Sequence, residues 1–201
     1  TAISYCLDDS ELGHNERLIA TALRAGARGH VVVATKGGLT RPDGRWEVDG
    51  SPAWLRTCAE RSARDLGAPI PLYYLHAVDP NVPFADSVGS LARLREAGTI
   101  RAIGLSNVAL PELETALRIT PIAAVQNRCN LFERNDFASG LVERCRDGRR
   151  AHPRGNLLVG ARPLIARHQL DADLAAVGLA ATAAAAAAKV VAAATSVGDD
   201  G

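Results

Sequence analysis

A chain of 201 residues that is 47% hydrophobic and carries a formal net charge of +1 suits one well-cored domain over residues 1–201. Near-zero charge gives no electrostatic case for a nucleic-acid or membrane-surface partner, and no apolar run approaches the roughly 20 residues of a membrane span. The cysteines Cys6, Cys58, Cys129 and Cys145 are widely spaced, without a CxxC pair. They predict reduced thiols in a cytoplasmic protein, with neither a disulfide framework nor a metal site.

Apolar runs and amphipathic segments alternate along the chain at intervals of roughly 30 residues. The predicted helices are 15–26, 51–67, 84–97, 110–119 and a segment around 139–146. Asn15 is the expected N-cap of the first helix, and Gly26 its C-terminal stop. The predicted strands are 31–36, 72–77, 100–107, 122–127 and 156–161. Such alternation predicts right-handed βαβ units and a parallel sheet.

The strand at 31–36 runs into a lysine within the sequence VVVATKGG. Its unbroken β-branched run is typical of a strand buried on both faces, where an unpaired ammonium is expensive to bury. Lys36 and Lys189 are the only lysines in the chain, which otherwise uses arginine as its cation. Lysine is a compact charge with a tunable pKa, so Lys36 is a candidate functional residue. The equally weighted alternative is a lysine that extends out of the sheet into solvent.

The segment 37–50 is rich in Gly, Pro and Asp, which predicts an irregular loop. A loop of this length in a compact domain is usually functional, often as a lid. Ser51 and Pro52 then supply the cap and first position of the next helix. Near the end of the chain, 180–188 is nearly all alanine, and 189–196 is a candidate last strand.

These segments give at most seven strands, counting a short stub just before Tyr5. The expected architecture is a TIM-type (β/α)8 barrel that is incomplete, with its first strand and last helix missing, since a full barrel needs roughly 250 residues. An open doubly wound sheet is the alternative. Its dinucleotide-binding form has no support, because the sequence contains no GxGxxG motif.

Polar side chains stand at the carboxyl ends of the stub and of the first four predicted strands. They are Tyr5, Lys36, His76, Ser106 with Asn107, and Gln126. In a parallel barrel these ends converge on the face that carries the active site. Each residue also has an ordinary structural interpretation, because amides and hydroxyls cap helices and a lone histidine is more often part of a core.

Together, a phenol, an ammonium and an imidazole suggest a site that protonates a carbonyl oxygen. The Lys36 ammonium would stabilise the Tyr5 phenolate, and His76 would orient the carbonyl. Because no side chain supplies a hydride, such a site needs a redox cofactor. The polar ends Ser106, Asn107 and Gln126 suit the carboxamide of a nicotinamide ring.

The motifs TAISY, GHNERLIA, VVVATKGG, LYYLHAVDP, IRAIGLSNV and AAVQNRCNL closely resemble those of the aldo-keto reductases. The resemblance covers residues 1–163, and residues 164–201 diverge. It implies a TIM barrel, NADPH as cofactor and a small aldehyde or ketone as substrate. The implied catalytic residues are Tyr5 as general acid, Lys36 and His76. The implied cofactor-binding residues are Ser106, Asn107 and Gln126, and no metal is implied.

The chain departs from the family pattern at several positions. The family's catalytic aspartate immediately precedes the residue matched by Thr1, so it lies outside this chain. Cys6 replaces the glycine expected after the catalytic tyrosine, and Ala161 stands where an aromatic residue stacks on the nicotinamide. The segment that grips the cofactor's 2′-phosphate has no recognisable counterpart, except for a possible remnant at 194–198.

Two further functions remain open from the sequence. A non-catalytic nucleotide-binding protein, or an inactive fragment of the enzyme, would explain the missing aspartate and Ala161. A Schiff-base lyase would use Lys36 as a nucleophile, but it leaves the polar strand ends unexplained. The sequence indicates neither the carbonyl compound nor the oligomeric state, and the choice of NADPH over NADH rests on the resemblance.

Overall fold

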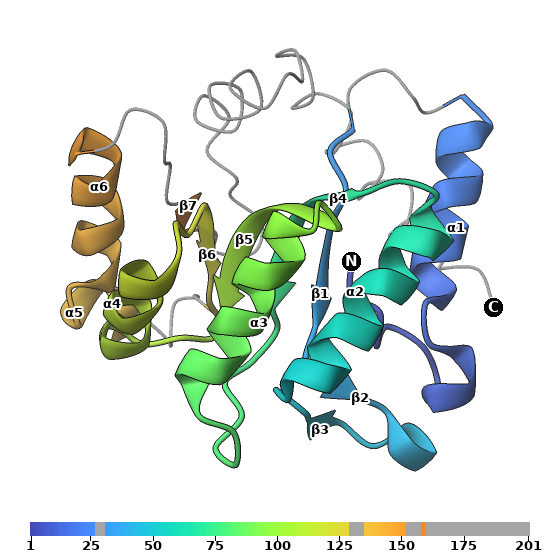
Figure 1. Cartoon of the computed structure of the whole chain (residues 1–201), viewed down its shortest axis with the longest axis horizontal. Helices are drawn as coiled ribbons and strands as arrows, with labels where there is room; N and C mark the ends of the chain where they lie inside the picture. Colours follow the sequence, from blue (N-terminus) through green and yellow to red (C-terminus); the bar gives the residue numbers. More distant parts are fainter. Residues whose placement is uncertain (27–30, 129–134, 152–157, 160–201) are drawn as a thin grey trace, which may run out of the picture.

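The computed structural model describes residues 1–26, 31–128, 135–151 and 158–159, which form an α/β fold around a parallel sheet (Figure 1). The sheet has five strands in the order β1 (Ala34–Gly37), β4 (Ile70–Leu75), β5 (Ile100–Ser106), β6 (Ala124–Gln126) and β7 (Leu158–Val159). All neighbouring strands are parallel. Because this order follows the chain without reversing, the sheet is a stretch of barrel wall, and the doubly wound alternative is wrong.

Helices cover one face of the sheet, and neighbours in sequence pack side by side (Figure 1). They are α1 (His14–Arg24), α2 (Pro52–Leu66), α3 (Phe84–Glu96), α4 (Leu110–Ile119), α5 (Asn135–Ala138) and α6 (Leu141–Ala151). Along β4, Tyr73 and Leu75 face these helices and are fully buried, as are Ile103 and Leu105 on β5. The residues between them point to the opposite face, because side chains alternate along a strand.

The middle of the chain follows the prediction closely. The Ser51 hydroxyl accepts a hydrogen bond from the Trp54 amide, so the cap of α2 is where the sequence places it. The bounds of α4 match the prediction, and those of α3 and β5 differ from it by one residue at the end. The strand β5 stops at Ser106 because Asn107 adopts a left-handed backbone conformation with φ of 57°.

Other predicted bounds are wrong by two or three residues. The first sheet strand begins at Ala34, which pairs with Leu72. The preceding position on β4 is Pro71, which lacks an amide hydrogen and cannot extend the ladder. The cap of α1 is Gly13 with φ of 77°, and Asn15 lies inside the helix. The Gly13 amide donates to the Ile3 carbonyl at 2.9 Å, which fixes where this helix begins.

The segment 37–50 is not an irregular loop. Gly37 completes β1, and the short strands β2 (Leu39–Thr40) and β3 (Glu47–Val48) form an antiparallel hairpin. A 3-10 turn, η2 (Pro42–Gly44), connects them. A second such turn, η1 (Asp9–Glu11), precedes α1 and was not predicted. Strands of two residues are too short to show alternation in a sequence.

Residues 1–3 lie along the edge of β1 that faces away from β4. The Thr1 amino group donates to the Ala34 carbonyl at 2.7 Å, and the Ile3 amide donates to the Lys36 carbonyl at 3.2 Å. This is the expected stub before Tyr5, although it forms no assigned strand.

Several predicted features lie outside the described residues. They are Cys129, Ala161, both ends of the strand at 156–161, and the segments 180–188, 189–196 and 194–198. Within the part that is described, no helix is both long enough and apolar enough to cross a membrane.

Candidate active site

The sheet brings the predicted polar side chains to its carboxyl edge in two rows. Register places Lys36 opposite Tyr74 and Tyr74 opposite Gly104, which makes one row on the face away from the helices. Two residues further along, Ser106 pairs with Gln126, and His76 follows directly after the Leu75–Leu105 pair. Lys36 therefore lies one row below His76 and Ser106.

Lys36 is buried, with 8% of its surface exposed, so it does not extend into solvent. Its Nζ donates to the Thr1 carbonyl at 3.2 Å. The same atom lies 5.4 Å from the centre of the Tyr5 ring and 5.9 Å from that of the Tyr74 ring. The two aromatic faces compensate part of the cost of burying the ammonium.

Tyr5 joins the strand-end residues from outside the sheet. It lies in a turn in which its amide donates to the Ala2 carbonyl at 3.0 Å. Its ring centre is 5.8 Å from that of His76, with the two planes at 73°. On another side, its ring centre is 6.3 Å from that of Trp46, in an edge-to-face arrangement. The phenol thus lies between the ammonium, the imidazole and an indole.

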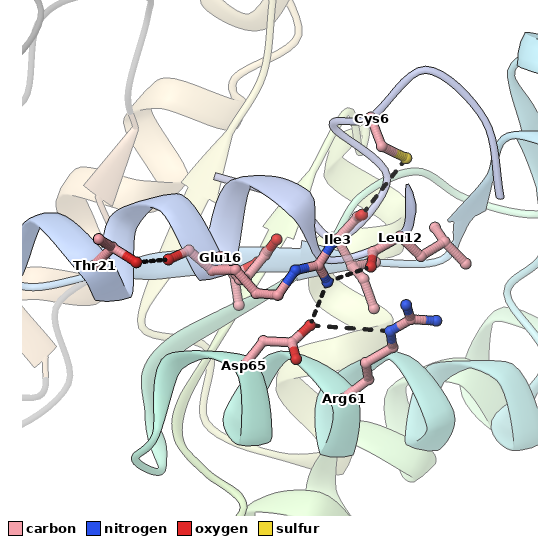
Figure 2. Close-up of polar contacts among 9 residues, drawn as sticks. Ile3, Cys6, Leu12, Glu16, Thr21, Arg61 and Asp65 are labelled. Carbon is pink, nitrogen blue, oxygen red and sulfur yellow. Dashed lines mark hydrogen bonds and ion pairs between the residues drawn. The ribbon is translucent and has the colours of Figure 1, made fainter. Parts of the chain in front are cut away.

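Polar contacts anchor the segment that carries Tyr5 (Figure 2). The Cys6 thiol, whose pKa is raised mainly by burial, donates to the Ile3 carbonyl at 3.9 Å. Arg17 of α1 donates to the Leu12 carbonyl at 2.9 Å and to the Asp65 carboxylate of α2 at 3.2 Å. Figure 2 shows Arg61 approaching the same carboxylate from α2. These contacts attach the segment that precedes α1 to α2.

His76 is neutral at pH 7. Burial, together with the charges of Lys36 and of the Thr1 amino group, lowers the pKa of its imidazole to about 4. Its backbone is fixed on both sides, because its amide donates to the Gly37 carbonyl at 2.9 Å and its carbonyl accepts from the Asn107 amide group at 3.1 Å. Its Nδ1 is buried without a partner among the described residues. A neutral imidazole donates at one nitrogen and accepts at the other.

Ser106, Asn107 and Gln126 present a mixed set of donors and acceptors. The Asn107 side-chain NH2 donates to the His76 carbonyl and to the Ser106 hydroxyl oxygen, each at 3.1 Å. Its own backbone amide donates to the Gln126 carbonyl at 3.2 Å. Among the described residues, nothing bonds the amide oxygen of Asn107, the Ser106 hydroxyl proton or the Gln126 side chain, so these groups can meet a ligand. This set matches the needs of a carboxamide, which both donates and accepts.

Tyr74 also belongs to this site, although it is absent from the residues that the sequence analysis selects. Tyr73 is in the core, whereas Tyr74 is on the face of Lys36. Burial raises the pKa of the Tyr74 phenol to about 12, so it stays protonated. The sequence spacing indicates this position of Tyr74, because Tyr74 and His76 are two residues apart on one strand and therefore share a face.

Two further elements of the site come from the hairpin and from β6. The Arg41 guanidinium lies 4.0 Å from the centre of the Trp46 ring and donates to the Leu7 carbonyl at 3.0 Å. After β6, the Asn127 side chain accepts from the Val108 amide at 3.1 Å and donates to the Val108 carbonyl at 2.6 Å. Asn127 thereby fixes the loop that follows Asn107. Nothing in the sequence separates it from an ordinary loop asparagine.

Among the described residues, no three His, Cys, Asp or Glu side chains lie close enough together to hold a metal ion. The described cysteines Cys6 and Cys58 are free thiols.

Comparison with known proteins gives a consistent result. Residues 1–164 match the model of the Aldo/keto reductase family. A probable aldo-keto reductase from Glycine max is 37% identical over 137 residues, which make up 66% of this chain and 39% of that protein. The chain thus spans less than half the length of this relative.

Solved structures of two bacterial proteins share the fold. A glycerol dehydrogenase from Gluconobacter oxydans is 30% identical with a TM-score of 0.61, over 73% of this chain and 45% of that one. An aldo/keto reductase from Klebsiella pneumoniae, in complex with NADP and acetate, is 23% identical with a TM-score of 0.53. That match covers 67% of this chain and 45% of the Klebsiella chain.

Proposed function

We propose, because this chain belongs to the aldo/keto reductase family, that it reduces an aldehyde or ketone to an alcohol with a hydride from NADPH. The observation that carries the proposal is the grouping at one sheet edge of a phenol, a buried ammonium and a neutral imidazole. Bound NADPH would supply the hydride to the carbonyl carbon, a step for which no side chain is suited.

Tyr5 is the proton donor in this proposal. As the carbonyl oxygen gains charge, the Tyr5 hydroxyl gives it a proton and the alcohol forms. The Lys36 ammonium, 5.4 Å from the ring centre, stabilises the phenolate that is left. Solvent then returns a proton to Tyr5. General acid catalysis of this kind contributes typically about 10²- to 10⁴-fold to a rate.

His76 orients the carbonyl in this proposal and does not act as an acid. With its pKa at about 4, the imidazole is not in its imidazolium form at pH 7 and therefore does not act as an acid. Its one N–H still donates a hydrogen bond. A donor next to Tyr5 places the carbonyl oxygen where the phenol can reach it. The same low pKa prevents a second positive charge from arising close to Lys36.

The nicotinamide carboxamide would be held by Ser106, Asn107 and Gln126. The free amide oxygen of Asn107 would accept from the carboxamide NH2, and the Ser106 hydroxyl would donate to its carbonyl. A structure of this fold from Klebsiella pneumoniae contains NADP, and the proposal of NADPH for this chain rests on the family resemblance. The substrate would be a small carbonyl compound selected in part by the 37–50 hairpin. The free thiols suit the reducing cytoplasm.

The decisive experiment compares wild-type chain with Tyr5→Phe. NADPH-dependent turnover of a panel of aldehydes should fall by about 10²- to 10⁴-fold in the variant. NADPH binding, read from tryptophan fluorescence, should be unchanged, because the variant keeps the aromatic ring at position 5 and loses only the hydroxyl. Equal turnover in the two proteins would refute the role of Tyr5. Binding of NADPH without turnover in the wild-type chain would favour a non-catalytic nucleotide-binding protein.

A further inference from the structure

The hairpin of β2 and β3 carries Trp46, whose ring stacks on the Arg41 guanidinium of the same hairpin at 4.0 Å. Each of its strands has two residues, and Glu47 and Val48 are exposed. A short two-stranded ribbon is marginally stable in water on its own. Trp46 is itself 54% exposed, while its ring meets the edge of Tyr5. The position of the Trp46 ring therefore also depends on the contacts that attach the hairpin to the rest of the domain.

The hairpin returns to the domain at Gly50, and both polar groups of this residue are bound by side chains from the segment after β4. The Gly50 amide donates to Asp79 Oδ2 at 2.8 Å, and the Gly50 carbonyl accepts from the Ser87 hydroxyl at 2.7 Å. Asp79 and Ser87 are 7% and 2% exposed. A buried, charge-assisted hydrogen bond is stronger than a neutral one on the surface.

The approach of these groups is close enough to demand glycine. A Cβ at position 50 would lie 2.8 Å from the Cβ of Asp79 and 3.1 Å from the Ser87 hydroxyl oxygen. The second oxygen of Asp79 accepts from the Asn81 amide at 2.8 Å, which fixes the carboxylate within its own loop. Asp79 therefore couples two loops of the site, the one that starts at His76 and the one that carries Trp46.

We propose that Asp79 is a positioning residue that holds Trp46 against Tyr5, and so fixes the side of the site where the carbonyl compound enters. The opposite end of the hairpin is held separately, since the Asp9 amide donates to the Arg41 carbonyl at 3.2 Å and the Arg41 amide donates to the Asp9 carboxylate at 2.5 Å. Loss of the Asp79 carboxylate would loosen the return half, which then keeps the Ser87 hydroxyl bond to Gly50 at 2.7 Å and the Asp49 amide bond to the Gly38 carbonyl at 3.1 Å. The proposal concerns the proposed reduction: it predicts weaker use of the carbonyl substrate, while the cofactor side at Ser106 and Asn107 is unaffected.

The test is ¹⁹F NMR of the full chain labelled with 5-fluorotryptophan. The chain has two tryptophans, and Trp46→Phe assigns the two signals. Asp79→Ala should shift and broaden the Trp46 signal and leave that of Trp54, on α2, in place. Asp79→Asn should give a smaller shift, because one amide oxygen still accepts. The matched control is Asp86→Ala, which removes an exposed carboxylate in the first turn of α3.

Kinetics then test the consequence. In Asp79→Ala, KM for the carbonyl compound should rise by about ten-fold, with kcat and NADPH affinity changed by less than about two-fold. An unchanged Trp46 signal in folded Asp79→Ala, or in Asp79→Asn if the alanine variant does not fold, would overturn the proposal. So would a shifted signal with an unchanged KM. If the wild-type chain shows no turnover, the proposed function fails, and the Trp46 signal alone decides whether Asp79 positions the hairpin.

Discussion

The Tyr74 ring occupies the space above Gly104, its partner across the β4–β5 pair. A Cβ on residue 104 would lie 2.3 Å from Tyr74 Cδ1 and 2.4 Å from Cε1. These atoms belong to a rigid ring that also faces the Lys36 ammonium. The absence of a side chain at Gly104 therefore determines where the ring lies beside Lys36.

Gly104→Ala should destabilise the protein. The added methyl group forces the Tyr74 ring away, and overpacking of this kind costs about 1–3 kcal/mol in the free energy of unfolding. Urea denaturation measures the change. Gly89→Ala on α3 is the control, because its new Cβ meets no atom closer than 3.5 Å, and it should stabilise the protein by about 0.5–1 kcal/mol. Equal midpoints for wild type and Gly104→Ala would show that the ring moves at no cost.

Gly104→Ala should also affect the proposed reaction if turnover is measured. Displacement of Tyr74 removes one of the two aromatic faces around Lys36, which holds the charge beside Tyr5. We expect kcat to fall by about ten-fold or more, because small displacements of a catalytic group have large effects. A normal kcat in a destabilised variant would limit Tyr74 to a packing role.

The stability of the protein should decrease as the pH falls from about 6.5 to about 4. His76 has its pKa lowered to about 4 in the folded protein, whereas an unfolded histidine titrates near ~6.5. In this range the unfolded chain binds the extra proton, so protonation favours unfolding, by up to about 3 kcal/mol at the lower end. Above pH 6.5 this contribution to stability is fully present.

His76→Gln should flatten that part of the pH profile. The measurement is the urea midpoint at several pH values, restricted to the upper part of the range, where few carboxylates titrate. His14→Gln, at an exposed position on α1, should retain the wild-type slope. A parallel decline in all three proteins would show that His76 titrates normally.

Thr35→Val should cost about 1–3 kcal/mol of stability, although it preserves the shape of the side chain. The Thr35 hydroxyl donates to Glu16 Oε1, and both residues are completely buried between β1 and α1. The other oxygen, Oε2, has no partner among the described residues, so the variant would leave the whole carboxyl group without a hydrogen bond. Thermal unfolding compares it with Thr57→Val on the exposed side of α2, which should change little.

The helices were predictable because their ends carry local signals. Ser51 and Gly67 mark both ends of α2 through a side-chain cap and a left-handed glycine with φ of 76°. The alternation of strands and helices likewise predicts, from the sequence alone, that Lys36, His76 and Gln126 lie at a common edge of the sheet. Their proximity depends on strand order, and the alternation of strands and helices determines that order.

The remaining features depend on contacts between distant parts of the chain. The start of β1 is decided by Pro71 on another strand, and the cap of α1 by the carbonyl of Ile3. The hairpin depends on Asp79, which the sequence presents as one more aspartate in a turn. The extent of the single domain over residues 1–201, and the roles of the individual site residues, stay predictions.

In the hairpin, the stability of the fold and the proposed contact with substrate can change independently of each other. Residues 41–47 contribute nothing to the buried core between the sheet and its helices, and Arg45, Trp46 and Glu47 are exposed. Substitutions there can therefore accumulate without eroding the fold, while the chemical groups on the strands stay as they are. If the proposed reduction is correct, a change of carbonyl substrate through these residues would cost little stability, so long as Gly50 and its two side-chain partners are kept.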